Sequence, residues 1–248
     1  MSQKVVASIE ARMNASRLPG KVLKPLGGKP ALTQMLDRVR RSRLLDDIVI
    51  ATTDSPRDDE IYEWSISEGV ACYRGSEDDV LDRVRRAQEL MGSEIVVELC
   101  GDCPLLEPAV IDLAITEYRE SGADLVSTVI EPQFPGGIDV EVFSVESLEW
   151  VAENVSDLSV REHVSLYFYQ HPDRYLLRQL TAPKRWWAPK VRLLLDYPED
   201  LVLLTAVFDT FANRSASDFG LDDVLKELGR NEKLNKLHDR CLARVADG

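Results

Sequence analysis

Three basic side chains lie close together near the start of the chain, in residues 11–23, which read A-R-M-N-A-S-R-L-P-G-K-V-L. The cations are Arg12, Arg17 and Lys21, and they follow the apolar run at residues 5–9, which is typical of a buried strand. The loop after the first strand of an α/β sheet lies at the carboxyl edge, where such sheets bind ligands. Arginine offers a fork that matches phosphate oxygens, and lysine a compact charge. The loop therefore predicts a polyphosphate site, with a solvated basic turn as the alternative.

Two acidic residues follow apolar runs farther along the chain. Asp102 comes after residues 94–100, and Asp196 stands in L-L-L-D-Y-P-E-D-L, where an apolar run meets a helix start. Magnesium prefers a few carboxylates together with phosphate oxygens and water. The two acids therefore predict a Mg²⁺ pair beside the cationic loop. The alternatives are a turn cap before Pro104 for Asp102 and a helix-entry role for Asp196.

Small polar residues end the second predicted strand and begin the next helix. Thr53 and Asp54 either line a nucleotide pocket or serve only the helix entry. Ser76 precedes three acids in G-S-E-D-D, and either contacts a base or caps the helix that follows.

Candidate acceptor contacts come from the middle of the chain. Asp139 and Glu141 alternate along a predicted strand over residues 138–143, so they share one face and meet an acceptor, a metal or water. The segment S-V-R-E ending at Glu162 reads as a capping box. His163 next to it is either an acceptor contact or a structural histidine.

The composition excludes several classes of protein. The chain has 248 residues, and 43 acidic against 30 basic residues give a net charge of -13, which argues against a nucleic-acid partner. No apolar run approaches the roughly 20 residues of a membrane span. The start, M-S-Q-K, has no signal-peptide pattern, so a cytoplasmic protein is expected. Cys100 and Cys103 are expected to be reduced packing residues. Motifs for dinucleotide oxidoreductases, P-loop NTPases and G-x-S-x-G hydrolases do not occur.

Strand and helix signals alternate through the first half of the chain. Strands are expected over 46–53, 70–73 and 94–100, and helices over 30–44, from Ser55 to Gly69, from Ser76 to Gly92 and from Pro108 to Gly122. This alternation is typical of an α/β fold with a mainly parallel sheet and helices on both faces. Right-handed crossovers bring the loops after the strands to one edge. The loops with the cations and Asp102 are therefore expected to converge.

The second half departs from this alternation, although one domain over 1–248 is still expected. Strands are expected over 123–130, 138–143, 174–180 and 191–195, and helices from Val145, from Ser159 to Tyr169 and from Pro198 to Phe211. Residues 131–190 are predicted to be an insertion that covers the site and pairs with a second subunit. Trp186 and Trp187 are either an interface anchor or part of a locally packed loop. A helical tail over 213–248 is expected to break at Gly229.

These segments occur in the same order in a known family. The chain resembles the cytidylyltransferases that make CMP-sugars, and is most similar to their spore-coat-polysaccharide branch. The resemblance covers residues 4–211. It rests on A-R-M-N-A-S-R-L-P-G-K-V-L, A-T-T-D, R-G-S-E-D-D-V-L-D-R, G-D-C-P-L, G-G-I-D-V-E-V-F-S, R-E-H-V and L-D-Y-P-E-D-L. It implies a three-layer α/β/α nucleotide-diphospho-sugar transferase fold with a mixed, mainly parallel sheet, and a homodimer.

The implied reaction joins CMP from CTP to a small acidic or phosphorylated acceptor and releases pyrophosphate. Arg12, Lys21 and Asp102 are the implied catalytic residues, and Asp102 and Asp196 the Mg²⁺ ligands. The implied nucleotide contacts are Ala11, Arg12, Ser16, Arg17, Lys21, Thr53, Asp54, Ser76 and Asp102. The predicted acceptor contacts are Asp139, Glu141, Glu162 and His163.

Two alternatives to this activity stay open. Glu10 stands where the branch usually has a neutral glutamine, and either repels the nucleotide or pairs with Arg12. A non-catalytic nucleotide-binding subunit is therefore one alternative. The other is a glycosyltransferase of similar fold, against which the absence of a D-x-D motif counts. The acceptor is left open among a nonulosonic acid, another sugar acid, and a small phosphate or phosphonate.

Overall fold

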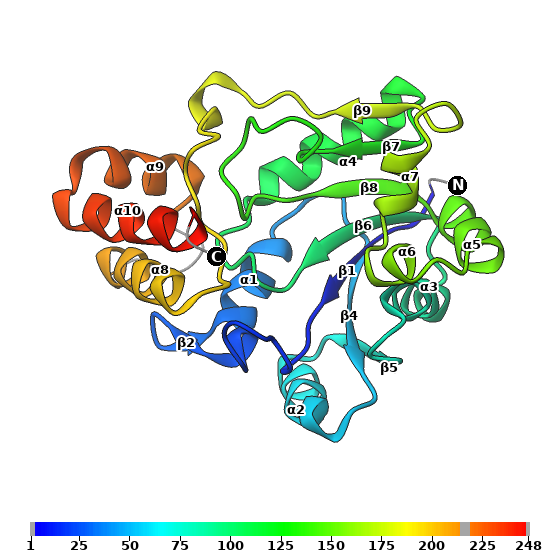
Figure 1. Ribbon diagram of the computed structural model, residues 1–248, viewed down its shortest axis with the longest axis horizontal. Helices are drawn as coiled ribbons and strands as arrows, with labels where there is room; N and C mark the ends of the chain where they lie inside the picture. The colour runs from blue at the N-terminus through cyan, green and yellow to red at the C-terminus, as the bar shows by residue number, and fades with distance from the viewer. Residues whose placement is uncertain (1–2, 214–218, 247–248) are drawn as a thin grey trace.

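One twisted sheet forms the centre of the molecule in the computed structural model, which describes residues 3–213 and 219–246 (Figure 1). Its strands are β1 (Val5–Glu10), β4 (Asp47–Thr53), β5 (Ala71–Gly75), β6 (Ile95–Cys100), β7 (Leu125–Ser127), β8 (Glu141–Ser144) and β9 (Leu177–Gln179). They lie in the order β5-β4-β1-β6-β8-β7-β9. β8 runs antiparallel to both of its neighbours, and the other pairs are parallel. The predicted mixed, mainly parallel sheet is confirmed.

Helices cover both faces of this sheet (Figure 1). They are α1 (Ala31–Val39), α2 (Asp59–Glu68), α3 (Val80–Met91), α4 (Pro108–Ser121), α5 (Val145–Asn154), α6 (Leu158–Glu162), α7 (Leu166–Gln170), α8 (Pro198–Thr210), α9 (Leu221–Arg230) and α10 (Glu232–Ala246). One apolar core joins the sheet to α1, α2, α4 and the group α8 to α10. A second core joins its other face to α3, α5, α6 and α7. The chain is therefore a three-layer α/β/α sandwich.

The central strand β1 is mostly apolar, because both of its faces are covered. Ala7 and Ile9 belong to the first core, and Val6 to the second, and all three are fully buried. This is the pattern expected of a parallel strand between two helical layers. The end of β1 is thereby held rigidly in the middle of the sheet, between β4 and β6.

Most helix boundaries of the first half follow their sequence signals. Ser55 accepts a hydrogen bond from Arg57 N, and α2 ends at Gly69 with φ of 63°. α4 begins at Pro108 and ends at Gly122. The predicted cap at Ser76 was wrong, because Asp79 accepts from Asp82 N at the start of α3. Ser76 lies in the preceding loop, where its hydroxyl accepts from Asp78 N.

Several predictions for the second half were also wrong. Asp157 caps α6, so Glu162 ends this helix instead of forming a capping box at its start. Residues 191–195 form no strand and make only one bridge, between Gly136 and Arg192. β8 is shorter than predicted, so that Asp139 precedes the strand and does not share a strand face with Glu141. These segments are short, and tertiary packing rather than local pattern decides their conformation.

The carboxyl-terminal helices lie together at one end of the sheet, on the left of Figure 1. The helical tail breaks at Asn231, between α9 and α10, and not at Gly229, which lies inside α9. Positions 214–218 and 247–248 of the predicted tail lie outside the described residues. Trp186 is 2% exposed and packs in the core, whereas Trp187 is 54% exposed. Within the described ranges, the helices are all too short or too polar to cross a bilayer.

Candidate active site

A cleft of about 440 Å³ opens at the carboxyl ends of β1 and β6. The chain leaves β1 toward β4 on one side of the sheet and reaches β6 on the other. Such a switch point is where open α/β sheets bind ligands. The cleft is lined by Glu10, Ala11, Arg12, Ala15, Ser16, Arg17, Lys21, Val22, Val80, Arg83, Cys100, Gly101, Asp102, Glu162, His163 and Asp196. The predicted convergence of the cationic loop with Asp102 and Asp196 is thus present in the structure.

The cationic loop is fastened to the rest of the sheet by Asp58, a residue that the sequence analysis missed. Asp58 is 1% exposed, and its carboxylate accepts hydrogen bonds from Met13 N at 2.7 Å, from Thr53 N at 3.3 Å and from the Thr53 hydroxyl. The loop then closes on itself through Gly20 N and Met13 O, with Gly20 at a φ of 69° that favours glycine. Asp58 therefore fixes the backbone position at which the cationic loop leaves β1.

Asp58→Ala is expected to lower the free energy of unfolding by about 3 kcal/mol, because buried N–H and O–H donors lose a charged partner. The matched variant Asp59→Ala removes only an ion pair with Arg74 in which the aspartate side chain is 57% exposed, and is expected to cost less than about 1 kcal/mol. Urea unfolding of both variants checks this prediction. Equal losses for the two would contradict the anchoring role of Asp58.

Lys21 lies between Asp102 and Asp196, the two aspartates predicted from the sequence to be Mg²⁺ ligands. Its Nζ is 2.6 Å from Asp102 Oδ2 and 3.0 Å from Asp196 Oδ1. Arg17 pairs with the other oxygen of Asp196. Burial tends to raise the pKa of Asp196, but the contacts with Lys21 and Arg17 outweigh it and hold that pKa below its usual value. The carboxylate of Asp196 is therefore ionised in this cleft.

This arrangement fits a divalent cation. Carboxylates from two separate segments converge on one positive centre, the Lys21 ammonium. Among the described residues no group of three or more His, Cys, Asp and Glu side chains is arranged to hold a metal. A site with two protein carboxylates matches magnesium, which completes its shell with substrate phosphates and water.

Arg12 differs from Lys21 and Arg17 in its ion pairing. Its side chain lines the cleft, and no acid in the described part of the chain forms an ion pair with it. The guanidinium is thus available to an incoming anion. Ser16 and Ala11 also line the cleft, and their contacts with a nucleotide stay predictions.

The floor of the cleft is formed where β1 meets β6. Glu10 and Cys100 lie opposite each other in the register, and Gly101 N donates to Glu10 O at 2.8 Å. A Cβ at position 101 would lie 2.6 Å from that carbonyl oxygen, so the close approach requires glycine. Sequence reasoning named Glu10 but missed Arg83, whose charge faces it from α3. Cys100 and Cys103 are both free thiols, and Cys103 packs in the core as expected, whereas Cys100 is exposed, so the prediction that it is a packing residue was wrong.

Five of the predicted site residues do not line the cleft. Thr53 is fully buried with its hydroxyl on Asp58, and Asp54 and Ser76 are exposed nearby. Glu141 is held by Ser165 at 3.0 Å and by the Tyr169 hydroxyl. Asp139 also stands outside the lining. Burial, with Asp102 nearby, raises its pKa to about 7. Their proposed roles at the nucleotide and acceptor stay predictions.

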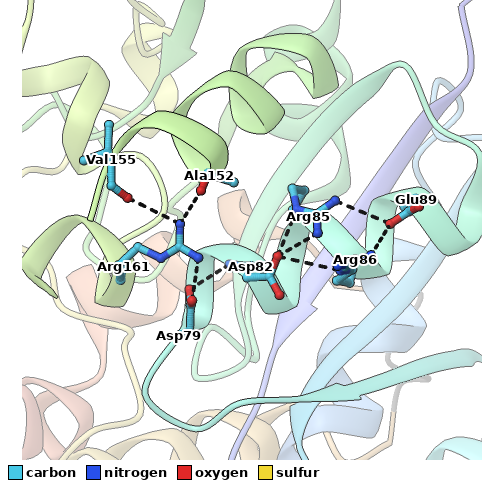
Figure 2. Close-up of polar contacts among 8 residues, drawn as sticks. All are labelled: Asp79, Asp82, Arg85, Arg86, Glu89, Ala152, Val155 and Arg161. Carbon is cyan, nitrogen blue, oxygen red and sulfur yellow. Dashed lines mark hydrogen bonds and ion pairs between the residues drawn. The ribbon is translucent and has the colours of Figure 1, made fainter. Parts of the chain in front are cut away.

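Glu162 and His163 do line the cleft, and Arg161 fixes the helix that carries them (Figure 2). The Arg161 guanidinium donates to Ala152 O at 2.7 Å and to Asp79 Oδ2 at 2.5 Å. It thereby ties α6 to the end of α5 and to the cap of α3. Figure 2 also shows the ion pairs of Asp82, Arg85, Arg86 and Glu89 farther along α3, away from this contact.

A family model described as "Cytidylyltransferase" matches residues 6–240. The chain is 34% identical over 228 residues to the spore coat polysaccharide biosynthesis protein SpsF of Bacillus subtilis, covering 90% of this chain and 93% of that protein. A 3-deoxy-manno-octulosonate cytidylyltransferase of Geobacter sulfurreducens is 35% identical over 127 residues, 50% of this chain and 49% of that enzyme.

A solved cytidylyltransferase structure from Leptospira borgpetersenii superposes with a TM-score of 0.87 at 28% identity, covering 94% of this chain and 97% of that one. The chain therefore belongs to the cytidylyltransferase family. It is an enzyme of the CTP-dependent nucleotidyltransferase class.

Proposed function

We propose that the protein transfers CMP from CTP to a sugar acid or phosphorylated acceptor and releases pyrophosphate, in the synthesis of a surface-polysaccharide or glycoconjugate precursor. The observation that carries this proposal is the convergence of Lys21 with Asp102 and Asp196 in the cleft that Arg12 also lines. That set pairs cations for a triphosphate with carboxylates for Mg²⁺. The names of the relatives, which mention octulosonate and a spore coat polysaccharide, support the choice of acceptor class.

The described residues divide the work as follows. Arg12, Arg17 and Lys21 bind and orient the triphosphate, and their charges stabilise the negative charge that builds up as pyrophosphate departs. The acceptor oxygen attacks the α-phosphorus from the side opposite the leaving group. Asp102 and Asp196 would hold Mg²⁺, which when bound neutralises phosphate charge. Glu162 and His163 also line the cleft, and in this proposal they contact the acceptor.

The test is pyrophosphate release from each of the four ribonucleoside triphosphates, with and without a panel of acceptors. The panel contains 3-deoxy-manno-octulosonate, a nonulosonic acid, a sugar phosphate and a phosphonate. Release that depends on CTP and on one acceptor supports the proposal. Consumption of a nucleotide sugar instead would indicate a glycosyltransferase, and nucleotide binding without release would indicate a non-catalytic subunit.

The homodimer and the cytoplasmic location stay predictions. Sedimentation of the purified protein tests whether it is a homodimer.

Arg17→Ala is expected to weaken CTP binding about tenfold, because a charge-assisted contact with phosphate is lost. The Arg17 side chain is 54% exposed, so the fold is expected to be unaffected. The control is Arg43→Ala, an exposed arginine before the start of β4, at the opposite end of the strands. Calorimetric titration of CTP measures both variants. An unchanged dissociation constant for Arg17→Ala would remove this residue from the triphosphate site.

A further inference from the structure

Asp196 follows a segment that lies outside the strands of the sheet. Residues 191–195 form no strand, so the ladder of the sheet does not fix the position of the aspartate. Leu195 N donates to Asp102 O at 2.9 Å, and the backbones that carry the two aspartates are therefore in direct contact. The place of the Asp196 carboxylate in the cleft depends on the side chains that hold this segment.

A buried carboxylate near the start of α8 is one of these side chains. Asp200 is 1% exposed, and its Oδ2 accepts from Asp196 N and from Tyr197 N, both at 2.9 Å. The Arg192 guanidinium makes a two-pronged contact with the same carboxylate, with Nε 2.9 Å from Oδ1 and Nη2 2.7 Å from Oδ2. Such a paired contact fixes geometry as well as charge. Asp200 thereby joins the two ends of the segment.

A histidine from the last helix also contacts the segment. Arg192 N donates to His238 Nε2 at 3.0 Å, across 46 positions of the chain. A ring nitrogen that accepts from an amide carries no proton, so His238 is neutral with its proton on Nδ1. Burial lowers the pKa of His238 against the opposing effect of Asp239, in agreement with a neutral ring. α10, which packs against α8, is thus tied to the backbone that leads to Asp196 (Figure 1).

The ring of Tyr197 provides a second contact between α10 and this segment. The guanidinium carbon of Arg244, on α10, lies 5.3 Å from the centre of that ring. Arg17 of the cationic loop lies over the same ring at 5.0 Å, and also pairs with Asp196. Both distances are within the range of cation–π attraction. The last helix and the cationic loop therefore meet at the residue next to the aspartate.

We propose that Asp200 and His238 are positioning residues, which hold the Asp196 carboxylate near Asp102 so that both can bind one divalent cation. This inference rests on the proposed function, in which Asp196 is a Mg²⁺ ligand. Neither positioning side chain lines the cleft, so both act through Arg192 and the backbone of Asp196. Groups that orient a metal ligand from behind typically contribute about 10–100-fold to metal affinity or activity.

A purely structural role is the alternative for both residues. Asp200 lies in the first turn of α8, where a carboxylate stabilises a helix, and His238 joins α10 to a neighbouring segment. Substitutions would then lower the midpoint of thermal unfolding and leave the metal affinity of the folded protein unchanged. Metal affinity measured well below the unfolding transition therefore distinguishes the two roles.

The test measures the Mn²⁺ affinity of the nucleotide-free protein by paramagnetic resonance, for wild type, His238→Leu and His238→Gln. Leucine removes the acceptor of Arg192 N, whereas the amide oxygen of glutamine can take the place of Nε2. His238→Leu is expected to weaken Mn²⁺ binding about tenfold, and His238→Gln to restore most of the affinity. The matched control is His171→Leu, because His171 is also half-buried, has a backbone contact at Tyr167 O and lies outside the cleft lining.

Asp200→Asn tests the same role from α8. Asparagine keeps one oxygen for the Asp196 amide, but its NH₂ group cannot accept from the Arg192 guanidinium. Mn²⁺ affinity is expected to fall about tenfold. The control is Asp209→Asn, an exposed aspartate on the same helix, which is expected to bind Mn²⁺ as wild type does. If His238→Leu does not fold, the result for Asp200→Asn decides the question.

Asp196→Asn is measured in parallel, so that the outcomes separate the two proposals. Weaker Mn²⁺ binding in Asp196→Asn, Asp200→Asn and His238→Leu, with recovery in His238→Gln, supports the positioning role. Weaker binding in Asp196→Asn alone overturns that role and leaves the proposed function standing, and so does a loss in His238→Leu that glutamine does not restore. If Asp196→Asn binds Mn²⁺ as wild type does, the metal assignment of the proposed function is contradicted, and the positioning role with it.

Discussion

Asp102→Asn is expected to lower CTP-dependent pyrophosphate release by about 10³-fold while leaving the fold intact. The amide cannot replace a carboxylate as a hard anionic ligand for Mg²⁺, and the loss of one charge-stabilising group at a transferring phosphoryl centre typically costs this much. The Asp102 side chain is 19% exposed and carries one of the two contacts of Lys21. Its replacement removes an interaction of the cleft and none of the apolar core.

Steady-state assays at saturating Mg²⁺ and CTP measure this effect, and thermal unfolding confirms the fold. The matched control is Asp173→Asn, an exposed aspartate in the turn before β9, which is expected to keep wild-type turnover. Full activity of Asp102→Asn would show that the metal assignment is incorrect, whereas equal losses in both variants would indicate a general effect of charge.

Lys21→Met is expected to have opposite effects on turnover and on metal affinity. Turnover should fall by about 10²–10³-fold, because the triphosphate loses the cation nearest to the two carboxylates. Affinity of the nucleotide-free protein for Mn²⁺ should rise, because the ammonium no longer occupies the space between Asp102 and Asp196. The aspartates then repel each other, and a divalent cation relieves that repulsion.

Paramagnetic resonance of free Mn²⁺ measures the affinity, and the pyrophosphate assay measures turnover. Lys226→Met, on the exposed side of α9, controls for the loss of one positive charge. A variant that binds Mn²⁺ more weakly than wild type would contradict the view that Lys21 competes with a cation for these carboxylates.

The sheet could be predicted because its strands carry strong local signals. Residues 5–9 and 95–100 are mostly apolar, each with a single polar residue, and Gly69 and Gly122 follow helices where the sequence places their ends. Short segments were not predictable in this way. α6 has five residues, and its start at Asp157 is decided by a side chain that accepts from Ser159 N and Val160 N. The run at 191–195 is apolar like a strand, yet it packs beside Gly136 with a single bridge.

The site was predictable where residues close in sequence share one chemistry. The loop cations and the acids that follow apolar runs, Asp102 and Asp196, line one cleft once the strands are ordered in a sheet. Asp58 and Arg161 were not predictable in their roles, because each depends on contacts between segments far apart in the chain. No periodicity or spacing encodes that Met13 N meets Asp58, 45 positions later.

The central claim is that one cleft binds a metal–CTP complex through the loop cations and through Asp102 with Asp196. Anomalous diffraction from crystals grown with CTP and Mn²⁺ tests it most directly. The account predicts one manganese peak within coordination distance of both carboxylates. The triphosphate is expected beside Arg12 and Arg17, and the Lys21 ammonium is expected to contact a phosphate instead of the aspartates. A nucleotide bound elsewhere, or a manganese ion in contact with neither aspartate, would contradict it.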